Sequence, residues 1–256
     1  MIRSLFTLLT AFVVTVILAP MAMVAALLGV REGPGSIHDK AMRWWATAVD
    51  RAAGVKVVVH GAENMPNGAV YISNHVSWFD VFAIAEVLPR YTWVAKSELR
   101  RLPIFGRGAE AAGVIFIERD NRKSAFESYE GAAAEVSRGR NVVVCPEGTR
   151  GAEYALRPFK KGPFVLAVAA QAPVVPVLVY GAREVMRKGS FRIRPGTVHV
   201  HFLPPISSTG LTYDQRDVLV KAAWQSIAAA LEQHYGIVSQ LPRQHTAPPL
   251  GDPARM

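Results

Sequence analysis

Residues 68–88 read GAVYISNHVSWFDVFAIAEVL, and this stretch determines how the centre of the chain folds. Residues 68–73 form a short apolar run that includes β-branched and aromatic side chains, which is typical of a strand buried on both faces. The segment from Ser77 to Leu88 is long and apolar enough for a helix. We therefore predict a strand, a short polar loop and a helix, which is the unit from which α/β proteins are built.

The same alternation of strands and helices continues on both sides of this unit. Further strands are predicted at residues 55–60, 91–95, 114–118, 141–145, 174–180 and 197–203. Further helices are predicted at residues 38–53, 123–137, 162–170 and 213–235. Because several strands are continuous apolar runs, we expect an α/β fold with a mixed, largely parallel sheet flanked by helices.

An apolar segment precedes this α/β region. Ser4 to Val30 contains 27 residues without a charge, and 21 of them are hydrophobic. A helix of that length reaches roughly 40 Å, more than the ~30 Å hydrocarbon core of a bilayer, and the run is too long for the apolar part of a signal peptide. We expect residues 1–31 to be a membrane segment, formed by one kinked helix or, because of Pro20, by two short helices in one leaflet.

The remaining chain divides into three parts. Residues 32–54 are predicted to form an interfacial helix, because adjacent Trp44 and Trp45 suit the membrane–water boundary; packing of these rings on the globular domain is the alternative. Residues 55–240 are predicted to form one globular domain. Residues 241–256 contain four prolines and are predicted to be a disordered tail.

Basic residues are concentrated in one part of the sequence. The chain has 29 Lys and Arg against 20 Asp and Glu, a formal net charge of +9. Residues 90–194 carry 19 of these basic and 10 of these acidic residues, so they account for the whole excess. Such an excess indicates an anionic partner: nucleic acid, a phosphorylated substrate or an anionic membrane. The single cysteine, Cys145, excludes an intrachain disulfide and a zinc site built from cysteines.

A histidine and a carboxylate stand five residues apart where the predicted helix begins. His75 is the residue type that acts as a general base near neutral pH, and a carboxylate on its second ring nitrogen would fix its tautomer. The two can meet if His75 lies in the loop and Asp80 in the first helical turn. The alternative is structural, because Ser77-x-x-Asp80 has the form of a capping box.

A second polar loop follows the strand predicted at residues 141–145. Residues 146–151 turn with two glycines at a strand end, where α/β sheets bind ligands. Arg150 offers a planar fork for a phosphate, and Glu147 can accept a hydrogen bond from a hydroxyl. A solvated turn with both charges in water is the alternative.

Four blocks of sequence resemble the motifs of glycerolipid acyltransferases in the same order. They are His75-x4-Asp80, GVIFIER at 113–119, PEGTR at 146–150 and VPV at 175–177, with KSEL at 96–99 and FKKG at 159–162 also similar. Together they span about residues 71–181, and four ordered blocks make the resemblance specific. The nearest group is the 1-acyl-sn-glycerol-3-phosphate (lysophosphatidic acid) acyltransferases.

This resemblance implies an enzyme that transfers a fatty acyl group from an acyl thioester to the sn-2 hydroxyl of lysophosphatidic acid, giving phosphatidic acid. His75 would be the general base and Asp80 the carboxylate that orients it. The sequence does not assign the donors that would hold the oxyanion; backbone N–H groups at the helix start are one candidate. The implied substrate-binding residues are Arg119, Glu147, Gly148, Thr149, Arg150 and Lys160.

The chain departs from the family at two positions beside the third motif. Cys145 stands where the family often has an aromatic residue, and Gly151 stands where it often has Ser. Neither residue type supplies the chemistry. Because this loop lies near the acceptor site in the family, both positions bear on the choice of acceptor.

The resemblance implies no resident cofactor, with acyl-CoA or acyl carrier protein as the thioester co-substrate. Membrane lipids and a lysophosphatidic acid-like acceptor are the expected partners, and no nucleic acid. No metal is expected either: His199 and His201 share a strand face without an evident third ligand. Basic Arg31, Lys40 and Arg43 follow the apolar segment and Arg3 alone precedes it, which indicates a membrane protein with its catalytic domain on the cytoplasmic face.

Three other functions are consistent with these residues. The first is acyl transfer to another lysolipid, such as a lyso-aminolipid or lysophospholipid. The second is a lipid hydrolase that uses the same His-Asp pair, although the sequence has no G-x-S-x-G nucleophile elbow. The third is a membrane-anchored module that binds anions without catalysis, in which His75 and Asp80 would have no task.

Overall fold

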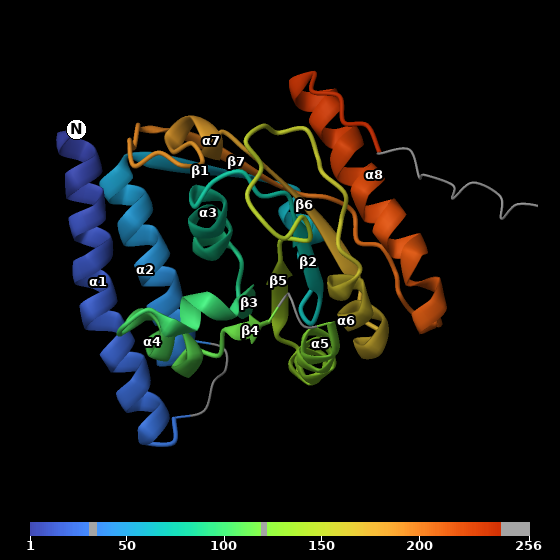
Figure 1. The fold of residues 1–256 in the computed structure, drawn as a ribbon, viewed down its shortest axis with the longest axis horizontal. Coiled ribbons are helices and arrows are strands. Elements are labelled where there is room, and N and C mark those ends of the chain that lie inside the picture. The colour runs from blue at the N-terminus through green and yellow to red at the C-terminus, as the bar shows by residue number, and fades with distance from the viewer. Residues whose placement is uncertain (31–34, 119–121, 242–256) are drawn as a thin grey trace, which may run out of the picture.

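The computed structural model describes residues 1–30, 35–118 and 122–241, and seven strands in them form one sheet (Figure 1). The order across the sheet is β1-β7-β6-β2-β5-β3-β4. Strands β2 to β6 run parallel to one another, while β7 is antiparallel to β6 and parallel to β1. The predicted fold class is therefore confirmed. The strands are β1 (Val55–His60), β2 (Val70–Ser73), β3 (Tyr91–Lys96), β4 (Ile115–Ile117), β5 (Asn141–Val144), β6 (Val174–Tyr180) and β7 (Gly196–Phe202).

Helices cover both faces of the sheet. Helices α5, α6 and α8 pack on one face, and α2, α3 and α7 pack on the other. The α-helices are α1 (Ile2–Leu27), α2 (Ile37–Ala53), α3 (Phe79–Val87), α4 (Phe105–Ala111), α5 (Arg122–Ser137), α6 (Gly162–Ala170), α7 (Ala182–Val185) and α8 (Arg216–Tyr235). Three single turns of 3-10 helix are η1 (Ala62–Asn64), η2 (Ser97–Arg101) and η3 (Tyr213–Gln215).

The central strands are apolar throughout because each of their faces is buried against a layer of helices. In β2, Val70 and Ile72 enter the core under α5, α6 and α8, while Tyr71 enters the opposite core. In β5, Val142 and Val143 alternate in the same way. The period of two along a strand thus supplies both cores, and polar residues are left for the strand ends.

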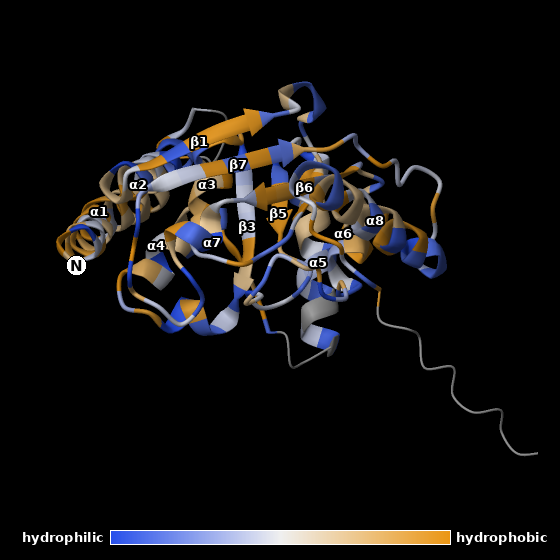
Figure 2. Ribbon diagram, turned by 90° about the horizontal axis from the view of Figure 1, so that it is seen from above, coloured by the Kyte–Doolittle hydropathy of each residue, from blue (hydrophilic) through white to orange (hydrophobic). Residues whose placement is uncertain are grey.

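Helix α1 runs along the side of the molecule and packs against α2 and α4 (Figure 1). It is continuous through Pro20, and it is long and apolar enough to cross a membrane, with a mean hydropathy of 2.4. Much of its apolar surface is exposed, including the side chains of Phe6, Phe12 and Ile17, and Figure 2 shows the apolar helix at one edge of the molecule. This helix supports membrane association of the chain.

The two adjacent tryptophans of α2 have different surroundings. Trp45 packs edge to face on Phe82, with ring centroids 4.9 Å apart, and its indole N–H donates to Thr15 Oγ1 over 2.9 Å. Trp44 is half exposed. Of the two alternatives predicted for this pair, Trp45 therefore packs on the protein, whereas Trp44 is exposed enough to reach a membrane interface.

Two parts of the predicted organisation differ from the structure or lie outside it. No helix is predicted between residues 97 and 113, yet α4 forms there although it contains two glycines. A Cβ on Gly108 would lie 2.2 Å from the Ala19 Cβ, so glycine is what allows α4 to approach α1 closely. Except for Leu241, the tail predicted at 241–256 lies outside the described residues.

Candidate active site

The candidate site lies where the carboxyl ends of neighbouring parallel strands meet. The loop after β2 carries His75, the loop after β5 carries residues 146–151, and β3 ends at Lys96. β2 and β5 are neighbours and parallel, so their loops leave the same edge of the sheet. This edge is where α/β sheets bind ligands.

His75 and Asp80 are in direct contact. His75 Nδ1 lies 3.0 Å from Asp80 Oδ2, and the same oxygen accepts the backbone N–H groups of Val76 at 2.6 Å and Ser77 at 2.8 Å. Asp80 is buried, while 16% of the His75 side chain is exposed. Asp80 therefore holds the imidazole together with the backbone of the loop. The N-cap of α3 is Trp78, which makes no side-chain cap hydrogen bond, so of the predicted capping box only the bond from the Ser77 N–H to Asp80 is present.

This geometry explains why α3 begins at Phe79 and not at the predicted Ser77. The chain at Val76 and Ser77 turns around the Asp80 carboxylate instead of entering the helix. Since those two N–H groups are bound to Asp80, the expectation that amides at the helix start hold an oxyanion is wrong for them.

The backbone of His75 is held by the loop after β5. Its N–H donates to Glu147 Oε1 over 3.1 Å, and its carbonyl accepts the N–H of Gly151 over 2.7 Å. The preceding residue, Asn74, is buried and exchanges two hydrogen bonds with the backbone of Val179 on β6. The position of the imidazole is thus fixed from both neighbouring strands.

Both oxygens of Glu147 are engaged by the protein. Oε1 accepts from His75, and Oε2 accepts from Arg157 Nε over 2.9 Å. Arg157 also donates to Thr149 Oγ1 over 3.0 Å and to the Thr149 carbonyl. Burial raises the pKa of Glu147, and the hydrogen bonds from Arg157 and His75 oppose that rise. Glu147 therefore links the loop after β5 to the loop after β2. It does not line the cavity, although the sequence predicts that it binds a hydroxyl of the substrate.

Arg150 lies over the ring of Trp78, with its guanidinium carbon 4.9 Å from the ring centroid. Burial lowers the pKa of Arg150 and the nearby Asp80 carboxylate raises it, but an arginine stays protonated at neutral pH. The cation is held by a flat aromatic surface, which leaves the edge of its fork available to an anion.

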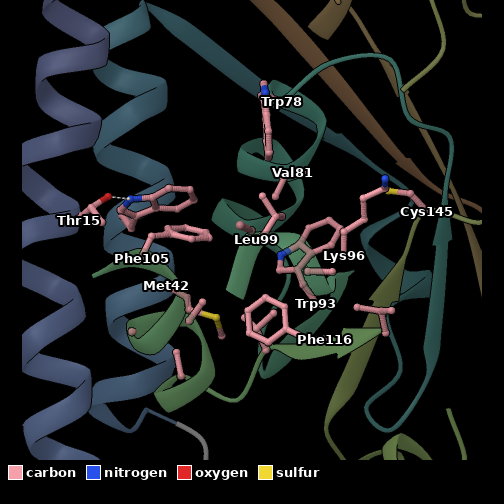
Figure 3. Close-up of a pocket in the computed structure, with 18 of the residues that line it drawn as sticks. Thr15, Met42, Trp78, Val81, Trp93, Lys96, Leu99, Phe105, Phe116 and Cys145 are labelled. Atoms are coloured by element: carbon pink, nitrogen blue, oxygen red, sulfur yellow. Dashed lines mark hydrogen bonds between the residues drawn. The ribbon is translucent and has the colours of Figure 1, made fainter. Parts of the chain in front are cut away.

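A cavity of about 430 Å³ begins at His75 and extends away between the helices (Figure 3). Its polar end holds His75, Gly148, Thr149, Arg150 and Lys188. Its other walls are almost entirely apolar and come from α1, α2, α3, β3, α4 and β4. The lining residues labelled in Figure 3 include Met42, Trp78, Trp93, Leu99, Phe105 and Phe116.

The structure brings most of the predicted site residues together. His75, Gly148, Thr149 and Arg150 line the cavity, and Asp80 lies behind His75. Lys160 is exposed beside Gly148 but does not line the cavity. The predicted Arg119 lies outside the described residues.

Sequence reasoning did not single out three contributions to the site. Arg157 fixes Glu147, Lys96 lines the cavity at the end of β3, and Thr15 and Trp45 bring α1 and α2 to its wall. Lys96 lies in the KSEL block, so that block could have indicated it. Arg157 has no sequence signal of its own.

A separate group of histidines lies at the edge of the sheet. His60 of β1 joins His199, with 3.0 Å between His60 Nε2 and His199 Nδ1, and its ring stacks on His201. His201 Nε2 lies 2.7 Å from the Tyr235 hydroxyl. Over residues 1–30, 35–118 and 122–241, no group of three or more His, Cys, Asp or Glu side chains is arranged to hold a metal ion.

Comparisons with known proteins identify acyltransferases that are similar to this chain. A family model described as Acyltransferase matches residues 56–180. The chain is 36% identical over 170 residues to a 1-acyl-sn-glycerol-3-phosphate acyltransferase of Limnanthes alba, covering 66% of this chain and 60% of that protein. It is 36% identical over 193 residues to a putative 1-acyl-sn-glycerol-3-phosphate acyltransferase of Caenorhabditis elegans, covering 70% of this chain and 68% of that protein.

A human and a bacterial protein extend these comparisons. The human 1-acyl-sn-glycerol-3-phosphate acyltransferase alpha is 35% identical over 184 residues, covering 70% of this chain and 65% of that protein. The crystal structure of the 1-acyl-sn-glycerophosphate acyltransferase PlsC from Thermotoga maritima has a TM-score of 0.74 at 24% identity, covering 93% of this chain and 97% of that one. The chain spans about 60% of the length of the two Limnanthes relatives it matches, and its fold is similar to PlsC over nearly the whole chain.

Proposed function

The chain belongs to the 1-acyl-sn-glycerol-3-phosphate acyltransferase family, and on that premise we propose that it acylates the sn-2 hydroxyl of lysophosphatidic acid to give phosphatidic acid. One observation carries the proposal. The His75–Asp80 pair and the Arg150 cation share one end of a cavity whose other walls are apolar. This reaction requires a base, a cation that binds the phosphate of the acceptor, and a channel that holds an alkyl chain.

His75 acts as the general base. Because Nδ1 is bound to Asp80, Nε2 is the ring nitrogen that can take the proton from the acceptor hydroxyl. The hydroxyl oxygen forms a bond to the thioester carbonyl carbon, the carbon–sulfur bond then breaks, and the imidazolium returns its proton to the departing thiolate. Asp80 stabilises the imidazolium in between. General base catalysis of this kind is worth about 10² to 10⁴ in rate.

The cation at the polar end receives the phosphate of the acceptor. Arg150 lines the cavity close to His75, and Lys96 and Lys188 line it as well. A planar guanidinium can bind two phosphate oxygens at once, which also fixes the orientation of the glycerol. We propose Gly148 and Thr149 as contacts within the same loop, with Arg119 and Lys160 as further cations for this anion.

The apolar part of the cavity holds an acyl chain. Helices α1 and α4 enclose it from one side, and strands β3 and β4 with α3 enclose it from the other. Ligand cavities of this size bury most of the surface of a lipid-like molecule, and their few polar groups set its orientation. The thioester donor is acyl-CoA or acyl carrier protein.

The enzyme works at a membrane surface, with its catalytic domain on the cytoplasmic face. The exposed apolar face of α1 supports the membrane location. In the sequence, Arg31, Lys40 and Arg43 follow the apolar run and Arg3 alone precedes it, and this distribution supports the cytoplasmic orientation only if α1 crosses the bilayer. In the structure, however, the first turn of α1 lies on the domain itself: Arg3 donates to the Ala53 carbonyl, and Ser4 accepts from the N–H of Ile193.

An assay with a labelled acyl thioester tests the proposal. The full chain in detergent micelles is offered lysophosphatidic acid together with other lysolipids, and labelled phosphatidic acid is the expected main product. His75→Ala should lower the rate by about 10² to 10⁴, while exposed His234→Ala serves as the matched control and should retain the parent rate.

Three results would contradict the proposal. Preferred acylation of a different lysolipid would assign another acceptor. Release of free fatty acid without acyl transfer would assign a hydrolase. Full activity of a correctly folded His75→Ala variant would exclude the proposed base.

A further inference from the structure

The loop between α7 and β7 is strongly basic and carries an exposed aromatic ring. Residues 187–194, here called the basic loop, read RKGSFRIR, and no Asp or Glu occurs between Glu184 and Asp214. Phe191 is 77% exposed. Four further exposed side chains are cationic: Arg187, Lys188, Arg192 and Arg194.

The basic loop is held in place by the protein. Ile193 is buried in the core between α2, α3 and the sheet. Its N–H donates to Ser4 Oγ over 2.9 Å, and the N–H of Arg194 donates to the carbonyl of Val185 over 2.9 Å. With Ile193 fixed inward, Arg192 and Arg194 on either side of it are exposed.

The four cations of the basic loop have no acidic partner in the described part of the chain. Each of the ion pairs found there joins other residues, for example Arg183 with Glu153. Four unpaired cations within eight residues produce a local positive potential, and the absence of nearby carboxylates leaves it uncompensated.

The basic loop connects two surfaces that the proposed function uses. Through Ser4 it is joined to the first turns of α1, where Ile2 and Leu5 are 88% and 71% exposed. Through Lys188 it reaches the polar end of the cavity. Figure 1 shows the connection between α7 and β7 beside the N-terminal end of α1.

We propose that the basic loop docks on the anionic surface of a phospholipid bilayer. Phe191 enters the boundary between headgroups and acyl chains, and Arg187, Arg192 and Arg194 contact lipid phosphates. This rests on the proposed function only in requiring that the enzyme work at a lipid surface. The contact places the polar end of the cavity next to the layer from which a lysolipid substrate arrives.

The chemistry of the loop favours a bilayer over an acidic protein as its partner. An aromatic ring beside basic side chains matches the membrane interface, where rings lie at headgroup depth and cations meet phosphates. The exposed apolar residues of α1 continue the same surface. An acidic carrier protein would use the cations but would have no need of an exposed apolar helix next to them.

A probe at position 191 tests the docking in the full chain. Cys145, the single cysteine, is changed to Ser, Phe191→Cys is introduced, and the new thiol is labelled with the aromatic fluorophore NBD. The protein is bound to vesicles of phosphatidylcholine with roughly one third phosphatidylglycerol, and quenching by nitroxide-labelled lipid is measured. We expect the probe to be quenched in these vesicles and much less in phosphatidylcholine alone.

Charge variants show which cations bind the loop to the anionic vesicles. Each cation near an anionic surface contributes about a fivefold gain in binding, so Arg192→Gln with Arg194→Gln should lower the ratio of quenched to unquenched probe roughly 25-fold. Arg138→Gln with Lys221→Gln is the matched control, because both side chains are exposed elsewhere on the molecule. A probe on Tyr213→Cys, at the α8 side, should remain in water.

Three results would overturn the docking proposal. The probe could remain in water while the protein sediments with anionic vesicles, or both charge pairs could have equal effects. A response of the probe to acyl carrier protein without vesicles would assign the loop to that partner. Acyl transfer is measured in micelles with the parent chain, with Cys145→Ser alone, because Cys145 lines the cavity, and with the labelled protein. An active parent enzyme together with an unquenched probe refutes the docking alone.

Discussion

The amide N–H of His75 donates to Glu147 Oε1 over 3.1 Å, so the proposed base and the glutamate of the neighbouring loop are joined through the backbone of His75. The other oxygen of Glu147 is held by Arg157 over 2.9 Å. The chain Arg157–Glu147–His75 thus positions the imidazole from the loop after β5, whereas Asp80 orients its ring from the first turn of α3. Two separate contacts determine one catalytic geometry.

Removing Arg157 should impair turnover more than acceptor binding. Arg157→Ala frees one oxygen of buried Glu147, and the resulting shift of His75 should lower kcat about 10- to 100-fold with a smaller change in KM. Loss of the cation also raises the pKa of Glu147 further above its usual range, so the variant should lose activity at a higher pH than the parent as the pH falls.

Steady-state kinetics across pH measure both effects. The matched control is Arg138→Ala, which removes an exposed arginine directly after the end of α5. If kcat is unchanged, or if the loss is equal at every pH, then Arg157 has no positioning role.

Asp80→Asn should lower both the rate and the stability. Asp80 Oδ2 alone accepts from His75, Val76 and Ser77; the oxygen of an uncharged amide accepts these hydrogen bonds more weakly than a carboxylate oxygen does and has no charge to stabilise an imidazolium. We expect a rate loss of about 10² to 10⁴ and a decrease of about 1–3 kcal/mol in the free energy of unfolding. Exposed Asp217→Asn is the control. An Asp80→Asn enzyme with unchanged activity would limit this residue to capping.

Asp50→Asn should stabilise the protein at high pH. Asp50 is buried in α2, and its carboxylate faces a second acid, Glu86. Burial, and next the charge and hydrogen bonding of Glu86, raise the pKa of Asp50 from its usual value of about 4 to about 9. The folded protein therefore binds a proton that the unfolded chain releases, and this contribution to stability is lost as the pH rises above about 4.

Thermal unfolding in detergent at pH 5 and pH 8 tests this sign. The gain from Asp50→Asn should be roughly 1–3 kcal/mol at pH 8 and smaller at pH 5. Asp214→Asn changes an exposed aspartate and should show no such pH dependence. Destabilisation by Asp50→Asn at pH 8 would mean that the carboxylate is charged and paired in the folded protein.

Filling the apolar part of the cavity should shorten the preferred acyl chain. Ala109 of α4 lines the cavity, and Ala109→Phe places a ring in the volume assigned to the alkyl chain. Competition between thioesters of different length should then favour the shorter ones relative to the parent enzyme. Ala134→Phe, at an exposed position of α5, is the control. An unchanged preference in a folded, active variant would place the acyl chain elsewhere.

The sheet and the catalytic loop were predictable because their signals are local. The predicted bounds of β6 and α6 agree with the structure residue for residue, since a continuous apolar run between turn residues has few alternatives. The contact between His75 and Asp80 could also be predicted from the sequence. The two residues are only five positions apart, and the end of the preceding strand fixes where the loop and the helix begin.

Contacts between distant segments were not accessible in the same way. α4 is short and has two glycines, and it exists because Gly108 fits against Ala19, a residue almost ninety positions away. That Arg157 reaches Glu147 depends on the path of an irregular loop between them. The apolar segment could be assigned to a membrane, but its composition gives no sign that its inner face lines the cavity.

The dual role of α1 has a practical consequence. Thr15, Leu18, Ala19 and Ala22 line the cavity while other side chains of the same helix face outward. Cutting away residues 1–30 to obtain a soluble enzyme would therefore remove one wall of the substrate site along with the anchor. Detergent that coats this helix lies within reach of the same site, so we expect its alkyl tail to compete with the acyl donor and apparent affinities to depend on the detergent chosen.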